Sequence, residues 1–149
     1  MTFSLEWDSR FKKNKNISVW PWSDLVSYVK RYSNFSKKNP KVLELGCGPG
    51  ANIPFFLSIT QNYYAIEGSS TIVKQLVKKF PKLKNNLVVG DFTLKIPFQK
   101  KFDMIYDRAA ITHNDTKSIL NCLENIHNKL NKNGLFIGID WFSTQHSDF

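Results

Sequence analysis

Residues 41–52, KVLELGCGPGAN, decide the fold of this chain. They begin with a short apolar run at 41–45, which is typical of a strand that is buried on both faces. Gly46, Gly48 and Gly50 follow, and residues without a Cβ let the backbone turn sharply and approach a ligand closely. The stretch therefore predicts a strand, a glycine turn and a helix that begins directly after the turn.

The rest of the chain repeats this alternation of apolar strands and amphipathic helices. The predicted strands are 41–45, 63–66, 86–89, 102–106 and 135–139. The predicted helices are 22–32, 52–59, 70–80 and 116–130, and Ser23 can cap the first of them. Strands that alternate with helices join through right-handed crossovers into a parallel sheet that is covered on both faces. We therefore expect a doubly wound, mainly parallel α/β fold of about five strands, which binds ligands at the carboxyl ends of its strands.

The composition fits one folded domain with a basic surface. The chain has 149 residues, 42% of them hydrophobic, and a net charge of +9. Its lysines are scattered, often beside asparagine, so a solvated surface explains them better than a nucleic-acid groove. No apolar run reaches the ~18 residues that suggest a membrane span, and the N-terminus lacks the layout of a signal peptide. We expect a cytoplasmic protein with an N-terminal helical and lid segment at 1–40 and an α/β core at 41–149.

Acidic residues stand where three predicted strands end. Glu44 precedes the first glycine of the turn, Glu67 follows the second strand, and Asp91 follows the third with Phe92 beside it. Each acid taken alone is explained as well by a helix cap or a surface carboxylate as by a role in ligand binding. Together, after a glycine turn, they favour a nucleoside site. The turn holds no lysine, which excludes a phosphate-binding P-loop and favours a ligand with a carboxylate and an ammonium group.

Five segments of the sequence carry the motifs of one known family. They are VLELGCGPG at 42–50, YYAIEGS at 63–69, VVGDF at 88–92, YDRAAITHN at 106–114 and LNKNGLFIGIDWF at 130–142. In this order and spacing they resemble the class I, Rossmann-like S-adenosylmethionine-dependent methyltransferases. Two shorter segments, WDSRF at 7–11 and WPW at 20–22, are similar to thiopurine-methyltransferase-like small-molecule enzymes. The resemblance implies methyl transfer from S-adenosylmethionine to a small-molecule acceptor, with S-adenosylhomocysteine as product.

The resemblance also implies which residues hold the cofactor. The glycine turn with Glu44 is expected to hold the methionine part, Glu67 the ribose diol, and Asp91 the adenine amine. Phe92 is expected beside the adenine ring. The complete set of expected cofactor-binding residues is Glu44, Gly46, Cys47, Gly48, Gly50, Asn52, Glu67, Gly68, Asp91, Phe92 and Asp107.

Candidates for the reaction itself follow the fourth predicted strand. They are Asp107, Arg108 and His113, and Asp140 after the fifth strand is a further candidate. Asp107 can face the acceptor, or it can pair with Arg108 or cap the turn. Arg108 can anchor an anionic substrate or cover the sheet edge. His113 can act as a base, since its unperturbed pKa lies near 6.5, or it can belong to the capping region of the next helix.

Three tryptophans near the N-terminus are candidates for a lid over the cofactor. They are Trp7, Trp20 and Trp22. Packing between an N-terminal helix and the domain explains them equally well.

The resembling family has a sheet of seven strands, and we find no sixth or seventh strand after 139 in this sequence. The chain is then either a truncated product or a natural short form. An uncovered strand edge invites pairing, so we predict self-association through Leu135 to Phe142. The alternative functions are a catalytically incomplete module that holds S-adenosylmethionine or S-adenosylhomocysteine, and an RNA methyltransferase suggested by the net charge. A nicotinamide-dependent oxidoreductase is a further alternative. Such an enzyme is expected to carry the motif GxGxxG, whereas this chain has GxGxG, which disfavours it.

Overall fold

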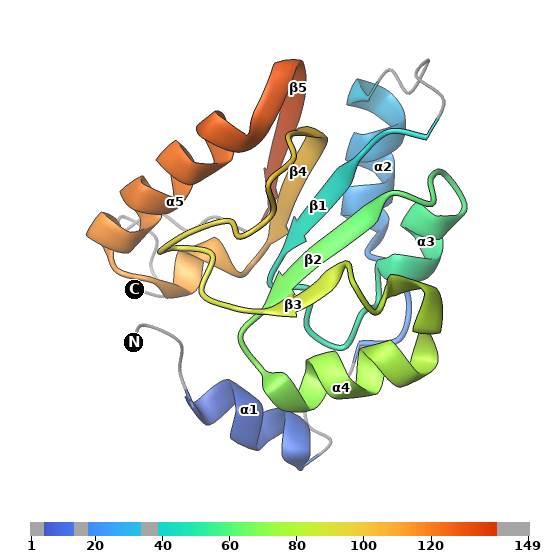
Figure 1. Cartoon of the computed structure of the whole chain (residues 1–149), viewed down its shortest axis with the longest axis vertical. Coiled ribbons are helices and arrows are strands. Elements are labelled where there is room, and N and C mark those ends of the chain that lie inside the picture. Colours follow the sequence, from blue (N-terminus) through green and yellow to red (C-terminus); the bar gives the residue numbers. More distant parts are fainter. Residues whose placement is uncertain (1–4, 14–17, 34–38, 140–149) are drawn as a thin grey trace.

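A sheet of five parallel strands organises the computed structural model, which describes residues 5–13, 18–33 and 39–139 (Figure 1). The strands are β1 (Val42–Leu45), β2 (Tyr63–Glu67), β3 (Leu87–Val89), β4 (Phe102–Arg108) and β5 (Leu130–Ile139). Their order across the sheet is β3-β2-β1-β4-β5, and each pairing is parallel. The predicted doubly wound α/β fold is confirmed.

The chain enters the sheet at its centre. From β1 it builds outward through β2 to β3, then crosses back to place β4 on the other side of β1. Glu44 of β1 consequently lies between Ala65 of β2 and Tyr106 of β4. The strand order reverses between β1 and β4, and folds of this kind bind ligands at that reversal, beyond the carboxyl ends of the strands.

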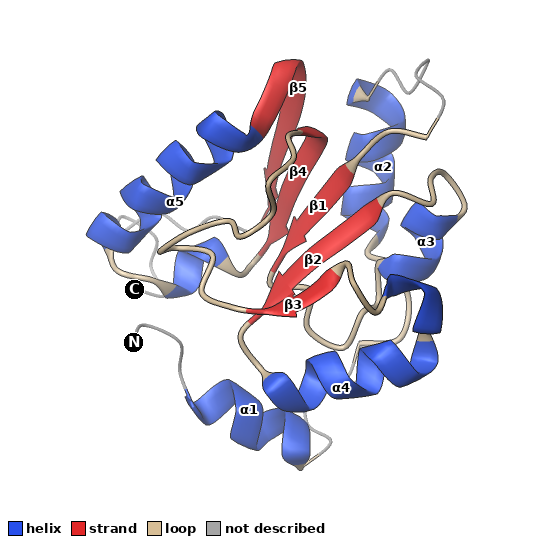
Figure 2. Cartoon of the chain, viewed as in Figure 1, coloured by secondary structure: helices blue, strands red, loops and turns tan. Residues whose placement is uncertain are grey.

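Helices cover both faces of the sheet (Figure 2). They are α1 (Leu5–Lys12), α2 (Ser23–Tyr32), α3 (Ile53–Leu57), α4 (Ser70–Lys79) and α5 (Thr116–Lys129), with short 3₁₀ turns at Pro81–Leu83 and Ile111–His113. Buried residues of α2, α3 and α4 pack with Val42 and Tyr106 on one face, whereas α5 packs with Leu43 and Ile105 on the other. Because successive strand side chains point to opposite faces, Glu44 belongs to the face covered by α2, α3 and α4.

Polar side chains fix the start of two helices. The Ser69 hydroxyl accepts the backbone N–H of Ile72 at the start of α4, and the Asp115 carboxylate accepts that of Ser118 at the start of α5. Each bond satisfies a backbone donor that the first helical turn leaves unpaired. The start of α4 matters for the site, because it lies directly after the end of β2.

The elements differ from the predicted ones at three places. The helix α1 was not among the predicted ranges. Ser23 does not cap α2: it is the first helical residue, and Trp22 stands at the cap position without a side-chain bond. The strand β5 begins at Leu130 because the chain pairs with Phe102 there, turns at Asn133 with φ of +63°, and pairs again from Leu135.

The segment predicted to self-associate lies at one edge of the described sheet. Among the described strands, β5 pairs only with β4 and so forms an edge of the sheet. The described part of the predicted segment, Leu135 to Ile139, belongs to β5. Residues 140–149 lie outside the described part of the chain. Self-association stays a prediction, which sedimentation at high protein concentration tests. In the described ranges, no helix has both the length and the apolar character needed to cross a lipid bilayer.

Candidate functional site

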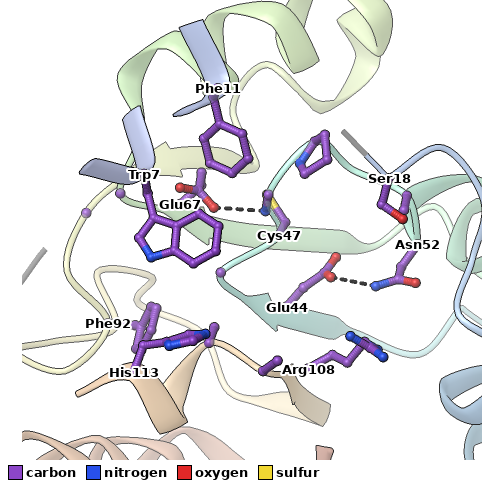
Figure 3. Close-up of a pocket in the computed structure, with 18 of the residues that line it drawn as sticks. Trp7, Phe11, Ser18, Glu44, Cys47, Asn52, Glu67, Phe92, Arg108 and His113 are labelled. Carbon is purple, nitrogen blue, oxygen red and sulfur yellow. Dashed lines mark hydrogen bonds between the residues drawn. The ribbon is translucent and has the colours of Figure 1, made fainter. Parts of the chain in front are cut away.

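A cavity of about 300 Å³ opens where β1, β2, β3 and β4 end (Figure 3). Its walls come from the glycine turn after β1, the ends of β2 and β3, the loop after β4, and the N-terminal segments around α1 and Trp22. The predicted cofactor-binding residues that line it are Glu44, Gly46, Cys47, Gly48, Asn52, Glu67, Gly68, Asp91 and Phe92. The predicted catalytic residues Arg108 and His113 also line it, whereas Gly50 and Asp107 do not.

The glycine turn passes through the left-handed region of backbone conformation. The φ angles of Gly46, Gly48 and Gly50 are +69°, +48° and +79°, and residues with a Cβ rarely adopt such values. A Cβ on Gly50 would lie 2.5 Å from Cδ2 of Leu76, so this glycine allows α4 to pack closely. Gly46 and Gly48 instead bring bare backbone to the cavity wall.

Glu67 joins the glycine turn to the start of α4. Its Oε2 accepts the backbone N–H of Gly48 at 2.8 Å, and its Oε1 accepts that of Ser69 at 2.8 Å. The side chain is buried, and burial raises the pKa of its carboxyl group. A carboxylate has about four lone pairs, so Glu67 retains the capacity to accept a ligand hydroxyl from the cavity beside its backbone bonds.

Glu44 enters the same cavity from the middle of the sheet. Its Oε1 accepts a hydrogen bond from Asn52 Nδ2 at 2.9 Å, and its Oε2 accepts one from the Tyr63 hydroxyl. The side chain is only 3% exposed. Burial raises the pKa of Glu44 to about 7, although the hydrogen bonds from Tyr63 and Asn52 act in the opposite direction.

Asp91 and Phe92 form the wall beyond β3. The Asp91 Oδ1 accepts the backbone N–H of Thr93 at 2.9 Å and also its hydroxyl, which fixes the turn. The Phe92 ring approaches Gly46 from the side, since its Cε1 would lie 3.7 Å from a Cβ there. A flat aromatic surface and an acceptor therefore stand together, which suits an adenine ring with its amino group.

Asp107 holds the loop after β4 and does not face the cavity. It is fully buried, and its Oδ1 accepts the backbone N–H groups of Ala110 at 2.9 Å and Ile111 at 3.0 Å. These bonds fix a loop in which Ala109 has a φ of +56°. Of the three roles that the sequence left open, these bonds correspond to the turn cap.

Arg108 and His113 lie on the cavity wall with aromatic neighbours. The Arg108 guanidinium carbon stands 3.6 Å from the centre of the Trp22 ring, and Nη2 pairs with Asp24 at 3.6 Å. The exposed His113 ring lies 5.5 Å from the Trp7 ring. Arg108, the last residue of β4, thus contacts Trp22 and Asp24 at the start of α2, and His113 is accessible to a substrate.

Residues from the N-terminal segments line the cavity, and Figure 3 labels Trp7, Phe11 and Ser18 among them. They are Trp7 and Phe11 of α1, with Ser18 and Trp22 from the chain that follows. Trp20 does not line the cavity and is 81% exposed. Trp7 and Trp22 thus line the cavity and Trp20 does not, and a lid formed by the N-terminal segment stays a prediction.

Phe11 and Ser18 line the cavity but were not among the predicted residues. Trp7 and Phe11 are four residues apart, a spacing that places both on one face of a helix and that offered a signal for Phe11. Ser18 lies in an irregular segment without periodicity, so no sequence pattern marked it. Asp140 lies outside the described residues.

A family model described as a methyltransferase domain matches residues 42–134. No match was found among the curated proteins. The matched range contains the whole glycine turn, the ends of β2, β3 and β4, and the loop that carries His113.

Several solved structures resemble this chain in fold. The DhpI–SAM–HEP complex has a TM-score of 0.71 and 16% identity, and the match covers 95% of this chain and 65% of that one. SAM-bound CalS10, an amino pentose methyltransferase from Micromonospora echinaspora, has a TM-score of 0.68 and 16% identity. The match covers 95% of this chain and 58% of CalS10. DesVI from Streptomyces venezuelae has a TM-score of 0.66 and 17% identity, and the match covers 84% of this chain and 52% of DesVI. This chain thus spans between 52% and 65% of the length of these three structures.

Proposed function

The chain belongs to the methyltransferase domain family, and from this premise we propose that it transfers a methyl group from S-adenosylmethionine to a small-molecule acceptor. One observation carries the proposal: Gly48, Glu67 and Asp91, from three separate strand ends, converge on one cavity. The cavity combines bare backbone, buried carboxylates and an aromatic wall, which together suit a nucleoside with an attached amino acid.

The residues divide the cofactor among them in our proposal. Glu67 accepts the ribose hydroxyls, since its two oxygens are already oriented by the backbone N–H groups of Gly48 and Ser69. Asp91 and Phe92 take the adenine ring. Glu44 and the backbone of Gly46 and Gly48 take the amino acid part. In S-adenosylmethionine the methyl group is activated by the positively charged sulfur that carries it.

The loop after β4 then orients the acceptor. Asp107 fixes this loop, so that Arg108 and His113 reach the cavity wall. Holding two reactants in line can supply roughly 7–11 kcal/mol of a reaction barrier. We propose His113 as the base for an acceptor that must lose a proton, and Arg108 as an anchor for an anionic group of the acceptor.

Calorimetry of ligand binding tests the cofactor assignment. We expect S-adenosylmethionine and S-adenosylhomocysteine to bind, and NAD not to bind. Glu67→Ala is expected to weaken both by at least about tenfold, because the ribose loses an acceptor in a buried site. Glu124→Ala changes an exposed residue of α5 and serves as the control. Binding of NAD without binding of either methionine-derived ligand overturns the proposal.

The acceptor is tested by class. Because CalS10 is an amino pentose methyltransferase, amino sugars are the first acceptors to assay with a labelled methyl donor. RNA is assayed beside them, since the net charge of +9 raises the alternative of a nucleic-acid substrate. Methyl transfer to RNA, with binding that weakens steeply as salt increases, would favour that alternative.

Cofactor binding without turnover is a second candidate function. The burial of Asp107 favours it, because that carboxylate is occupied by the loop instead of facing an acceptor. Tight binding of S-adenosylhomocysteine with no labelled product from any acceptor is the result expected of such a module.

A further inference from the structure

Glu44 stands in a buried cluster of neutral hydrogen-bonding groups at the floor of the cavity. The cluster consists of Glu44 on β1, Tyr63 on β2, Tyr106 on β4 and Asn52 before α3. Asn52 Nδ2 donates to one carboxyl oxygen at 2.9 Å, and the Tyr63 hydroxyl donates to the other. Tyr63 and Tyr106 are fully buried, and Asn52 is 4% exposed.

Among the residues that the structure describes, no cation forms an ion pair with the Glu44 carboxyl group. From β2, Glu67 adds a second acid, and from the glycine turn the Cys47 thiol lies close enough to be affected by Glu44. Arg108 lies on the same cavity wall, but its guanidinium is held between Trp22 and Asp24. A buried carboxylate that has hydrogen bonds but no cation is costly, and protonation removes that cost.

The missing positive charge can come from the ligand. Glu44 lines the cavity beside Gly48 and Asn52, and Figure 3 shows its carboxyl group directed toward Asn52. An ammonium group that reaches this point meets an acid that lines the cavity and whose two oxygens each accept a hydrogen bond, which leaves lone pairs for a further donor. Since opposite charges stabilise each other strongly where water is excluded, its arrival favours the ionised acid.

We propose that Glu44 holds a proton in the free protein and releases it when the ammonium group of the cofactor enters the cavity, with Tyr63 and Asn52 as positioning residues. The inference rests on the proposed function. In this step the O–H bond of the Glu44 carboxyl breaks, its electron pair stays on the carboxylate, and the proton passes to solvent. The carboxylate then pairs with the ammonium group, and no electrons are exchanged.

The pKa of Glu44, which burial raises to about 7, agrees with this inference. Below that pH the acid is mostly protonated in the free protein, so binding of an ammonium group must remove a proton. Apparent affinity is therefore expected to fall as pH falls below about 7, with a limit of about tenfold per pH unit for one proton.

Two adjacent tyrosines provide a matched pair of variants. Tyr63 and Tyr64 follow each other in β2, so their side chains point to opposite faces of the sheet. The Tyr63 hydroxyl donates to Glu44, whereas the Tyr64 hydroxyl accepts from Lys100 Nζ at 2.9 Å. Both phenol groups are buried, and replacement by phenylalanine removes one hydroxyl in each case. Only Tyr63→Phe is expected to affect Glu44.

The experiment is calorimetry between about pH 5.5 and pH 8 in pairs of buffers with different ionisation enthalpies, which gives the number of protons released. The probes are S-adenosylhomocysteine and 5′-methylthioadenosine, which shares the nucleoside but lacks the amino acid. We expect S-adenosylhomocysteine to release close to one proton near pH 6 and almost none near pH 8. Methylthioadenosine is expected to release none through Glu44.

The variants are expected to separate positioning from general damage. Loss of one hydrogen bond to a charged group raises a pKa by about one unit. Tyr63→Phe is therefore expected to weaken S-adenosylhomocysteine binding about tenfold near pH 6 and only about twofold near pH 8. Tyr64→Phe is expected to follow the wild type at every pH. Glu44→Gln is expected to abolish the proton release.

Each other outcome counts against the inference. Equal proton release with both probes, or proton release that persists in Glu44→Gln, assigns the proton to another group such as Glu67 or His113. Weakening by Tyr63→Phe that is the same at every pH shows a structural role only. If both probes bind without proton release, the inference fails and the proposed function stands. If neither probe binds at any pH, both fail.

Discussion

Gly46 has no room for a side chain. Its φ is +69°, and a Cβ at this position would lie 2.4 Å from the Cβ of Ala110. Gly46→Ala is therefore expected to lower the free energy of unfolding by about 2–4 kcal/mol, from backbone strain and from overpacking against the loop after β4. Urea unfolding measures the loss.

Gly90→Ala is the control for this substitution. A Cβ on Gly90 would make an ordinary contact, 3.5 Å from Cγ2 of Ile66, and this glycine does not have a positive φ. We expect its effect on unfolding to stay within about 1 kcal/mol. Equal losses in the two variants would contradict the role given to the Gly46 backbone.

Asp107 is expected to act on the loop and not on the acceptor. Asp107→Ala leaves the N–H groups of Ala110 and Ile111 without this acceptor, and each such loss costs about 1–3 kcal/mol. Asp107→Asn retains a side-chain oxygen, so its cost in urea unfolding is expected to be smaller. If Asp107→Ala unfolds like the wild type but loses methyl transfer, the side chain takes part in the chemistry.

At the scale of elements, a polar contact at Asp8 helps to attach α1 to the start of α4. The Ser69 hydroxyl donates to Asp8, and Lys12 pairs with Asp8 at 2.7 Å. Bonds from Lys12 first, and then Ser69, hold the pKa of Asp8 well below its ordinary value. Because the folded pKa is lowered, this contact stabilises the fold fully above the ordinary pKa near 4 and is lost only as pH falls through the lower value.

Asp8→Asn tests whether this contact keeps α1 over the cavity. Trp7 and Phe11 come from α1 and line the cavity, so a loosened helix exposes the ligand to water. At neutral pH we expect S-adenosylhomocysteine to bind about threefold to tenfold more weakly, with faster hydrogen exchange in α1. Asp115→Asn removes a carboxylate charge in the same way but at the start of α5, which does not line the cavity, and it is expected to leave affinity unchanged.

The helices and strands of the core could be predicted because each has its own periodicity. The strands β1, β2 and β4 are buried apolar runs, and α4 and α5 each present an apolar face, so local pattern and final environment agree. The position of α1 could not be predicted in this way. It depends on a contact between Asp8 and Ser69, which are 61 residues apart, and no local pattern encodes such a pair.

At the scale of the whole molecule, the parallel sheet explains why part of the site could be predicted from the sequence. Glu44, Glu67 and Asp91 are far apart in sequence, but the carboxyl ends of parallel strands meet at one edge, so the sequence placed them together. The side chains that surround Glu44 could not be predicted from the sequence. Tyr63 and Tyr106 reach it only through the register of three strands, which pairing decides and composition does not.

Glu44 also links the stability of the free protein to its ligand. Burial raises its pKa to about 7, above the ordinary value of 4.5, so folding takes up a proton between these pH values. The stability that this group contributes is thus present in full below about pH 4.5 and falls as pH rises through 7. Glu44→Gln has no such group. Its Tm is therefore expected to exceed that of the wild type by several degrees near pH 8 and to approach it near pH 5.

The ligand is expected to cancel most of this difference near pH 8. S-adenosylhomocysteine at about 100 times its Kd adds about 2.7 kcal/mol, which raises the Tm of a domain of this size by about 5–10 °C. The same concentration is expected to raise the Tm of Glu44→Gln much less, because a neutral amide does not pair with the ammonium group. Scanning calorimetry near pH 5 and near pH 8, with and without ligand, gives the Tm difference between the wild type and Glu44→Gln under each of these four conditions. A Tm difference between the ligand-free proteins that is the same near pH 5 and near pH 8 would show that the buried acid does not change its charge in this range.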